Sequence, residues 1–387
     1  MYCKKPCKVE VLKRHILSII FLALFVKLLY SIAGQYWLHA PANSKALMQL
    51  QQRNDSEWYK QIATQGYPKV SDVRDLGYAD SGVLKQSHWA FFPLYPAVNR
   101  LVMELCGCGY DVAATLNAFL FSLLLFIGFY LLARSRLDNE YAAFQATCIF
   151  IVFPFHYYFS MHYTESLYLM LVVYAFLAIE FRKYKALCVL LFLLPLSRPN
   201  GLVVALPLFL FMLEKEGLLE GLSLKIKLLI QWQQIKKILP FFAVILSWIL
   251  YSLYQHKLTG EYFAFSKAQA GWNKSFMFPL FALFREGDWR MQFNSVYTVF
   301  AIGMTVYLYR RSKASEQTYI WLGILLPLLA GSVVSMPRYI SALFPLFVLP
   351  FTAGALPKWG FRFALIACFA LQLVTFYFWV KSDWFSY

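Results

Sequence analysis

Long apolar runs separated by short polar linkers repeat along this chain. The first run, residues 16–38, is longer than the roughly 20 apolar residues that a bilayer-crossing helix needs, and no small-residue cleavage site follows it, so we expect it to be retained. The pattern predicts an all-α fold, a polytopic transmembrane helical bundle of about nine to eleven segments, forming one integral membrane domain over residues 1–387. The expected segments are 16–38, 112–133, 141–161, 165–181, 186–213, 238–256, 294–309, 317–334, 339–356 and 363–380.

One of these segments, 186–213, contains the sequence PLSRPNG, in which Pro195, Pro199 and Gly201 interrupt a helix. The linkers on both sides of it look cytoplasmic, so it must cross and return. We expect two half-helices or a bent hairpin, with Arg198 and Asn200 near the outer face. Broken backbone at membrane depth is tolerated where it is buried in protein or lines a watery cavity, so a cavity is expected nearby.

The basic linkers set the expected orientation, because short loops rich in Lys and Arg stay in the cytoplasm. This rule places residues 1–15 in the cytoplasm as the N-terminus and 214–237 there as an amphipathic segment. Residues 39–111 then form a helical extracytoplasmic loop. The polar clusters 162–166, 197–201, 260–274 and 335–339 fall on that same outer side. Their convergence predicts one membrane-embedded site there.

Composition supports this class, with 60% hydrophobic and only 14% charged residues. The net charge of +16 fits membrane topology and attraction to lipid headgroups better than nucleic-acid binding. The seven cysteines are odd in number and scattered, which fits packing thiols rather than a disulfide or zinc framework. No metal ion and no cofactor are predicted.

The stretch RNDSEWYKQIATQGYP, residues 53–68, is the first candidate for chemistry. Helical spacing puts Asp55, Trp58 and Tyr59 on one face, while Glu57 and Lys60 point elsewhere. A carboxylate on a partly dry aromatic face suits a general base acting on a hydroxyl group. The alternative is that Asp55 or Ser56 only caps the helix.

Two further patterns on the outer side are mainly structural. In the run HWAFFPLYPAVNR, residues 88–100, we expect an interfacial helix with Trp89 and Phe91 at headgroup depth. In HYTES, Thr164 is expected to cap a transmembrane helix and Glu165 to favour the positive end of its dipole. His162 and Glu165 have a spacing that also suits a metal pair, but no HExxH pattern is present.

Three basic residues, Arg198, Lys267 and Arg338, lie in polar motifs beside apolar sequence. A charge at the membrane boundary costs free energy unless it is paired or reaches water. Arg binds phosphate through two parallel hydrogen bonds and Lys as a point charge, so together these residues suit a lipid phosphate. The alternative is snorkelling, or pairing with Glu165, Glu57 or Asp288.

The ordered motifs DSEWYKQIATQGYP, FFPLYP, YTESLYL, SRPNGL, FAFSKAQAGW and MPRYISALFPLF resemble the PIG-V family, the second mannosyltransferase of GPI-anchor assembly, and its shorter bacterial relatives. Asn54 stands where the family has tryptophan. The matching residues are Asp55, Ser56, Thr164, Glu165, Ser166, Arg198, Asn200, Gly201, Ala268, Gln269, Trp272, Pro337, Arg338 and Tyr339.

This resemblance implies a fold of the glycosyltransferase C superfamily and an inverting transfer of a hexose, mannose in the family, from a polyprenyl-phosphate sugar. The acceptor would be a lipid- or glycan-linked hydroxyl on the extracytoplasmic face, in a bacterial inner (plasma) membrane, or in the ER membrane of a eukaryote. Asp55 is the expected catalytic base. The expected substrate-binding residues are Glu57, Trp58, Tyr59, His162, Glu165, Arg198, Asn200, Lys267, Gln269, Trp272, Arg338 and Tyr339.

Expected partners are the lipid-linked donor, the acceptor and membrane lipids, with no nucleic acid. Two other classes compete with the enzyme. A transporter or flippase of a lipid-linked or small solute would also contain broken helices with buried charge, although no repeat with paired broken segments is visible. A non-catalytic membrane scaffold would not need the polar clusters to share one side.

Overall fold

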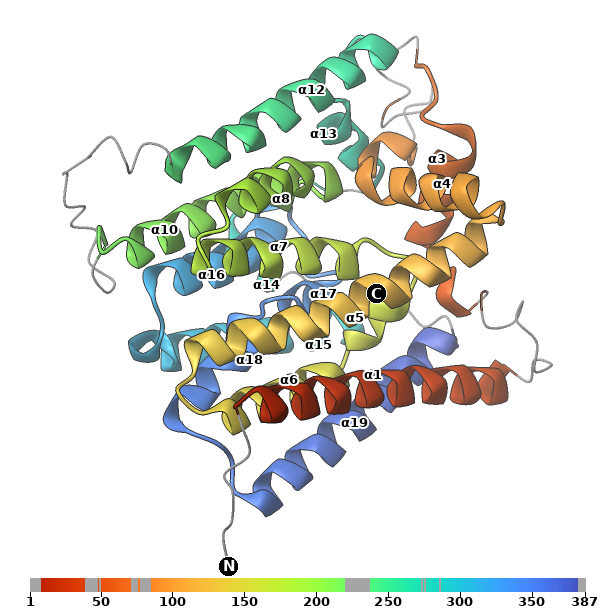
Figure 1. Cartoon of the computed structure of the whole chain (residues 1–387). Coiled ribbons are helices and arrows are strands. Elements are labelled where there is room, and N and C mark those ends of the chain that lie inside the picture. Colours follow the sequence, from red (N-terminus) through yellow and green to blue (C-terminus); the bar gives the residue numbers. More distant parts are fainter. Residues whose placement is uncertain are drawn as a thin grey trace, which may run out of the picture.

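In a computed structural model of the protein, the structure describes residues 8–38, 48, 50–70, 76, 85–219, 237–272, 274, 276–284 and 287–381. The predicted all-α class is confirmed, because these residues form helices and no strand (Figure 1). The chain is a polytopic helical bundle. Much of the predicted cytoplasmic segment 214–237 lies outside the described residues, as do Asp72, Asp75 and Asp80 of the predicted outer loop.

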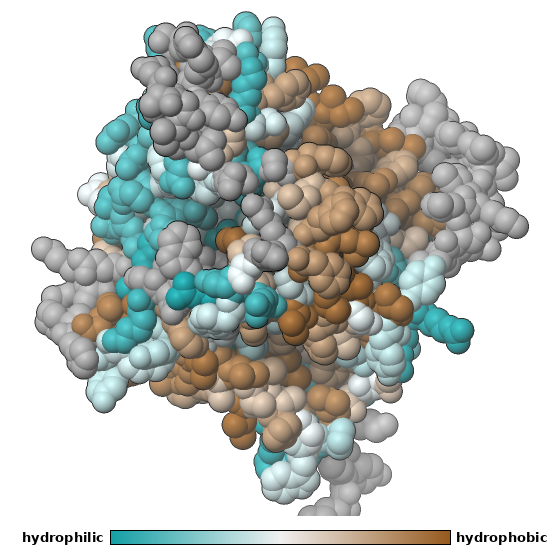
Figure 2. Space-filling view, turned by 180° about the vertical axis from the view of Figure 1, so that it is seen from behind, coloured by the Kyte–Doolittle hydropathy of each residue, from teal (hydrophilic) through white to brown (hydrophobic). Residues whose placement is uncertain are grey.

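Four described helices are long and apolar enough to cross a membrane. They are α1 (Lys8–Leu38), α5 (Tyr110–Arg136), α12 (Phe242–Thr259, preceded by the 3-10 turn η4, Leu239–Phe241) and α19 (Lys358–Val380). Large apolar side chains on α1 and α12 are exposed, such as Phe21 and Ile249. Figure 2 shows a broad hydrophobic surface beside a hydrophilic area. An exposed apolar surface of this extent suits contact with lipid.

The remaining helices are shorter or buried inside the bundle. They are α3 (Asp55–Gln65), α4 (Leu94–Cys106), α6 (Glu140–Val152), α7 (Glu165–Glu180), α8 (Tyr184–Ser197), α9 (Asn200–Val203), α10 (Ala205–Lys215), α13 (Ala264–Ala268), α14 (Pro279–Leu283), α15 (Trp289–Tyr307), α16 (Ala314–Leu329), α17 (Met336–Ser341) and α18 (Pro345–Val348). Short 3-10 turns are η2 (His88–Ala90), η3 (His156–Ser160), η5 (Gln269–Trp272), η6 (Tyr309–Arg311) and η7 (Leu349–Ala353).

Helix α7 is the centre of the bundle. It packs against α5, α8 and α10, and nearly all of its side chains are buried. A helix that is hydrophobic on every face favours such a position, because it is stabilised when all of its faces are buried. Helix α7 therefore fixes Glu165, its first residue, deep inside the protein.

The predicted break in segment 186–213 is confirmed. Helix α8 ends at Ser197, the short helix α9 begins at Asn200, and α10 continues from Ala205. Gly201 permits the close approach at this break, because a Cβ there would lie 2.0 Å from the carbonyl oxygen of Leu194. Any side chain would force the two segments apart.

Three expectations about structural elements were wrong. Segment 339–356 is not one helix but α17, α18 and η7, since Pro345 and Pro350 each start a new short helix. Segment 141–161 is divided at Phe153 and Pro154, after α6, and resumes as η3. The third expectation concerned two aromatic side chains of the outer loop.

Trp89 and Phe91 are not exposed at headgroup depth. Trp89 is fully buried, stacks on Tyr67 and donates a hydrogen bond from Nε1 to the carbonyl oxygen of Pro68, 3.2 Å away. Phe91 is 8% exposed and packs on Tyr59. Trp89 is enclosed by Tyr67, Tyr254 and the alanines of α13, and Phe91 by the aromatic face of α3, so protein and not lipid surrounds both rings.

Candidate functional site

Four charged side chains from distant parts of the chain form one continuous ion cluster. Arg338 Nη1 lies 3.4 Å from Asp55 Oδ2, and Arg338 Nε lies 3.4 Å from Glu165 Oε1. The same Glu165 oxygen accepts a hydrogen bond from Arg198 Nη1 at 2.8 Å. The order in space is therefore Asp55, Arg338, Glu165, Arg198, with alternating charge.

Burial differs along this cluster. The Glu165 and Arg338 side chains are 4% and 9% exposed, and Arg198 is 18% exposed. Asp55 is the most accessible at 31%. The cluster therefore runs from a dry interior to an edge where a polar molecule from outside can reach the carboxylate of Asp55.

Two polar atoms of the cluster have no hydrogen-bond partner among the described residues. They are Glu165 Oε2 and Arg338 Nε, both buried. Arg338 Nε lies within ion-pair distance of Glu165 but lacks hydrogen-bond geometry toward it. Buried polar groups are nearly always hydrogen-bonded, so unpartnered ones indicate a place where a ligand or water binds.

Helix ends position both acids. Asp55 is the first residue of α3 and Glu165 the first of α7, where the partial positive charge of a helix N-terminus favours a carboxylate. Ser335, which precedes the helix of Arg338, has a positive φ of 66°, and Asn54, which precedes Asp55, has a φ of 48°. Such conformations cost free energy outside glycine and concentrate at functional sites.

The expected helix caps at Asp55, Ser56 and Thr164 make no side-chain capping bonds in the structure. The N-cap of α3 is Asn54, whose side chain makes no capping bond, and Ser56 donates to the carbonyl oxygen of Arg53 instead. Neither Asp55 nor Ser56 is the N-cap residue. Thr164 is the N-cap residue of α7, but its side chain makes no capping bond either.

Tyrosine rings surround the two arginines. The Arg338 guanidinium lies 5.3 to 5.5 Å from the ring centroids of Tyr158, Tyr163 and Tyr339. The Arg198 guanidinium lies 5.6 Å from Tyr339 and 5.8 Å from Tyr168. Cation–π contacts of this kind stabilise a buried cation without neutralising it, so both arginines can still attract an anion.

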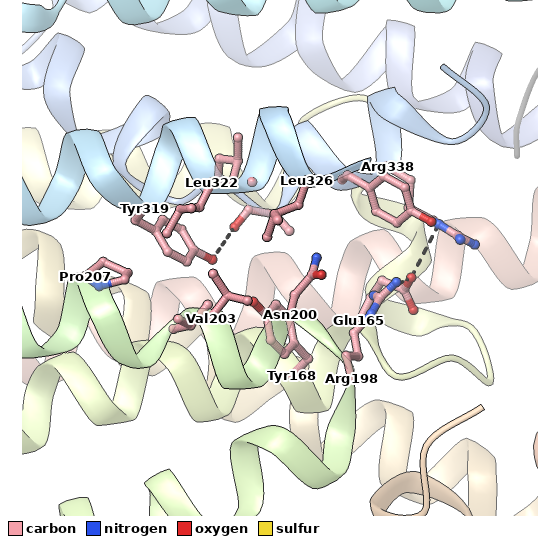
Figure 3. A pocket seen from close by; sticks show the side chains of 15 residues that line it. Glu165, Tyr168, Arg198, Asn200, Val203, Pro207, Tyr319, Leu322, Leu326 and Arg338 are labelled. Atoms are coloured by element: carbon pink, nitrogen blue, oxygen red, sulfur yellow. Dashed lines mark hydrogen bonds and ion pairs between the residues drawn. The ribbon is translucent and has the colours of Figure 1, made fainter. Parts of the chain in front are cut away.

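A cavity opens beside these charges. At one end it is lined by Glu165, Arg198, Asn200, Arg338 and Tyr339. Toward the other end α16 contributes Leu322 and Leu326, which face Val203 and Pro207 across the cavity (Figure 3). The cavity thus has a charged end and an apolar wall, as expected beside the break at PLSRPNG.

Aromatic side chains form a second group around Trp58 of α3. Trp58 stacks on Phe91, with ring centroids 5.8 Å apart, and meets Trp272 edge-on at 6.0 Å. Gln269 Nε2 lies 3.5 Å from the carbonyl oxygen of Ala90. Trp58 is one helical turn after Asp55, so the motifs of residues 53–68 and 268–272 meet as predicted.

Three other predicted site residues, Lys267, Glu57 and His162, lie outside both the ion cluster and the aromatic group. Lys267 pairs with Glu261 at 2.7 Å, and no contact with Arg198 or Arg338 is observed for it. Glu57 accepts from Gln52 at 2.8 Å on the exposed face of α3. Both side chains have nearer polar partners in their own segments.

His162 is the third, and it is fully buried. Its Nε2 lies 3.0 Å from the Thr115 hydroxyl. Burial lowers the pKa of His162 to about 4, so the ring is neutral near pH 7. The Tyr59 hydroxyl lies 3.4 Å from Oγ1 of Thr164, the residue before Glu165. Burial raises the pKa of Tyr59.

Sequence reasoning missed the tyrosines around the arginines. Tyr158, Tyr163 and Tyr168 lie in and after η3, in the stretch HYYFSMHYTESLY, whose tyrosine density was the available signal. Lys274 was also missed, although it interacts electrostatically with the Tyr339 phenol and follows Trp272 closely. Among the described residues, no group of three or more His, Cys, Asp or Glu side chains could hold a metal ion.

No family model and no curated protein matches the chain. Among solved structures it is similar to the oligosaccharyltransferase of Archaeoglobus fulgidus in the apo form, with 12% identity and a TM-score of 0.49, covering 96% of this chain and 56% of that one. It is also similar to the same archaeal enzyme, AglB, in complex with an inhibitory peptide and a dolichol-phosphate, with 12% identity and a TM-score of 0.46, covering 94% and 56%. The chain spans little more than half the length of these proteins.

Proposed function

We propose that the chain is a membrane glycosyltransferase that moves a hexose from a polyprenyl-phosphate donor to a hydroxyl of a lipid- or glycan-linked acceptor. The observation that carries the proposal is one cavity lined by two largely buried arginines, the carboxylate of Glu165 and an apolar wall, with the carboxylate of Asp55 paired to Arg338 beside it. Following the PIG-V resemblance, the sugar is mannose, the anomeric centre is inverted and the site faces away from the cytoplasm.

The cavity suits a lipid phosphate because its two ends differ. Arg198 and Arg338 would hold the phosphate at the charged end, where Arg338 Nε has no hydrogen-bond partner among the described residues. The isoprenoid would follow the apolar wall between α10 and α16. A free sugar nucleotide would leave that apolar wall uncovered.

The chemical step is one displacement. The acceptor oxygen attacks the anomeric carbon and forms the new glycosidic bond, while the bond from that carbon to the phosphate oxygen breaks. Asp55 takes the proton of the acceptor hydroxyl, and the electron pair of the broken bond leaves with the polyprenyl phosphate. Asp55 is the most accessible member of the cluster, which suits a group that meets an incoming acceptor.

Arg338 makes the charge change in this step favourable. It touches Asp55 in the resting site, and the carboxylate loses its negative charge when it accepts the proton. The departing phosphate gains one negative charge at the same time, so Arg338 can exchange one anionic partner for the other. In a buried site such stabilisation is worth more than in water.

The test is transfer of radiolabel from a polyprenyl-phosphate sugar in membranes that contain Asp55→Asn. Loss of a general base typically costs about 100-fold to 10,000-fold in rate. The matched control is Glu104→Gln, an exposed carboxylate on α4 that pairs with Arg100. Near-normal transfer by Asp55→Asn would contradict the assignment and move the base to Glu57, Glu165, Asp72, Asp75 or Asp80. Uptake of label into sealed vesicles without bond cleavage would favour the transporter instead.

A further inference from the structure

A second cavity lies at the other end of α7. Helix α7 runs from Glu165 to Glu180, about 22 Å at 1.5 Å per residue, and Glu180 lines this second cavity. It is therefore separate from the candidate active site, and nothing in the proposed transfer uses it.

The cavity has three cations and two carboxylates in its wall. Arg136 pairs with Glu316 at 2.7 Å, and Lys215 pairs with Glu180 at 2.7 Å. The fifth group, Lys313, forms no ion pair with a carboxylate in the part of the chain that the structure describes. The five groups together carry one net positive charge.

One acid outside the lining, Glu214, interacts electrostatically with Lys313. Its two carboxylate oxygens are already used by Ser315, one accepting from the backbone N–H at 2.9 Å and the other from the hydroxyl at 2.7 Å. Glu214 therefore lowers the local potential but does not hold the Lys313 ammonium.

Two of the cations converge on one aromatic ring. The ammonium groups of Lys215 and Lys313 lie 6.0 and 5.9 Å from the ring centroid of Phe211. Lys215 is already paired with Glu180, but Lys313 brings a second ammonium group to the same ring, and like charges repel each other unless an anion binds them. Apolar side chains make up much of the remaining wall, among them Leu132, Phe176, Phe344 and Val348.

We propose that this cavity binds the phosphate of an anionic phospholipid, with Lys313 and Lys215 on the phosphate and the acyl chain against the apolar wall. Basic pockets between membrane helices on the cytoplasmic side bind anionic headgroups in this way, and lysine serves as a point charge for phosphate. A lipid fits better than free phosphate because most of the remaining lining residues are apolar.

The experiment uses the purified full chain in detergent after delipidation. Its melting temperature is followed while dioctanoyl phosphatidylglycerol, dioctanoyl phosphatidylcholine or inorganic phosphate is added. We expect a saturable rise with phosphatidylglycerol and little change with the other two, since a ligand that binds only the folded state stabilises it. In Lys313→Gln the apparent affinity for phosphatidylglycerol should fall about tenfold or more, because one charge-assisted contact is lost.

The matched control is Lys185→Gln, which removes an equal charge from an exposed lysine at the start of α8. Lys313→Arg keeps the charge and should keep most of the affinity, and Lys215→Gln repeats the test from α10 if Lys313→Gln does not fold. The proposal would be overturned if phosphatidylglycerol and phosphatidylcholine raised the melting temperature equally. It would also be overturned if Lys313→Gln and Lys185→Gln changed the apparent affinity for phosphatidylglycerol equally. A full shift with inorganic phosphate alone would overturn the assignment to a lipid. These results do not depend on sugar transfer.

Discussion

At the scale of single residues, Glu165 keeps two buried guanidinium groups together. It accepts a hydrogen bond from Arg198 at 2.8 Å and lies 3.4 Å from Arg338, while its own side chain is 4% exposed. Taking such charges out of water is costly, and their mutual attraction offsets that cost only while every partner is present. The site is therefore sensitive to loss of this one carboxylate.

We expect Glu165→Gln to lower the free energy of unfolding by about 3 to 5 kcal/mol, since two arginines would then face each other with only Asp55 as a counter-charge. Thermal or denaturant unfolding of the purified protein measures the change. The control, Glu104→Gln, breaks an exposed pair in which the glutamate is 62% exposed and should cost less than about 1 kcal/mol. A Glu165→Gln protein as stable as this control would show that the ion cluster does not support the fold.

The sequence allowed most of the charged cluster to be predicted, but not its tyrosines. Asp55, Arg198 and Arg338 each stood out as a charge placed among apolar or aromatic residues, and pairing of the arginines with Glu165 was one of the alternatives considered. The chain has 26 tyrosines, and which of them contact an arginine depends on how η3, α7 and α17 pack. Lys267 was misplaced for the same reason, because its local partner Glu261 is nearer than the distant arginines.

At the scale of helices, the break between α8 and α9 places Arg198 and Asn200 at the cavity. Its position was predictable because two prolines and a glycine occur within seven residues. The division of 339–356 was harder to predict, since its composition is apolar throughout and its prolines also suit kinked spanning helices. Packing of α17 on η3, α15 and α16 decides in favour of short helices there.

We expect Gly201→Ala to disturb this break, because the new Cβ would lie 2.0 Å from a backbone oxygen, which cannot rotate away as a side chain can. Arg198 would shift from Glu165, and both the melting temperature and sugar transfer should fall. The control is Gly303→Ala in α15, where a Cβ meets nothing within 4 Å. That change should be neutral or stabilise the protein by up to about 1 kcal/mol. Equal melting temperatures for the two variants would contradict the tight approach at Gly201.

At the scale of the whole molecule, the two cavities lie at opposite ends of α7, and the charge pattern differs between those ends. The ion cluster is built from the first residues of α3 and α7, the α8–α9 break and α17. The other end carries basic residues at the end of α5 and at the start of α8, including Arg136 and Lys185. The positive-inside rule therefore predicts that the ion cluster lies on the extracytoplasmic side.

This orientation can be tested with single cysteines in a chain whose seven native cysteines are replaced. Glu57→Cys lies on the exposed face of α3 and Lys185→Cys at the exposed start of α8, so both thiols are accessible once a reagent reaches their side. A membrane-impermeant maleimide added to intact cells should label Glu57→Cys and should label Lys185→Cys only after the cells are opened. The reverse pattern would place the ion cluster in the cytoplasm. A donor that presents its sugar outside could then not reach Asp55, so the topology decides between an outward-facing transferase and one that uses a cytoplasmic substrate.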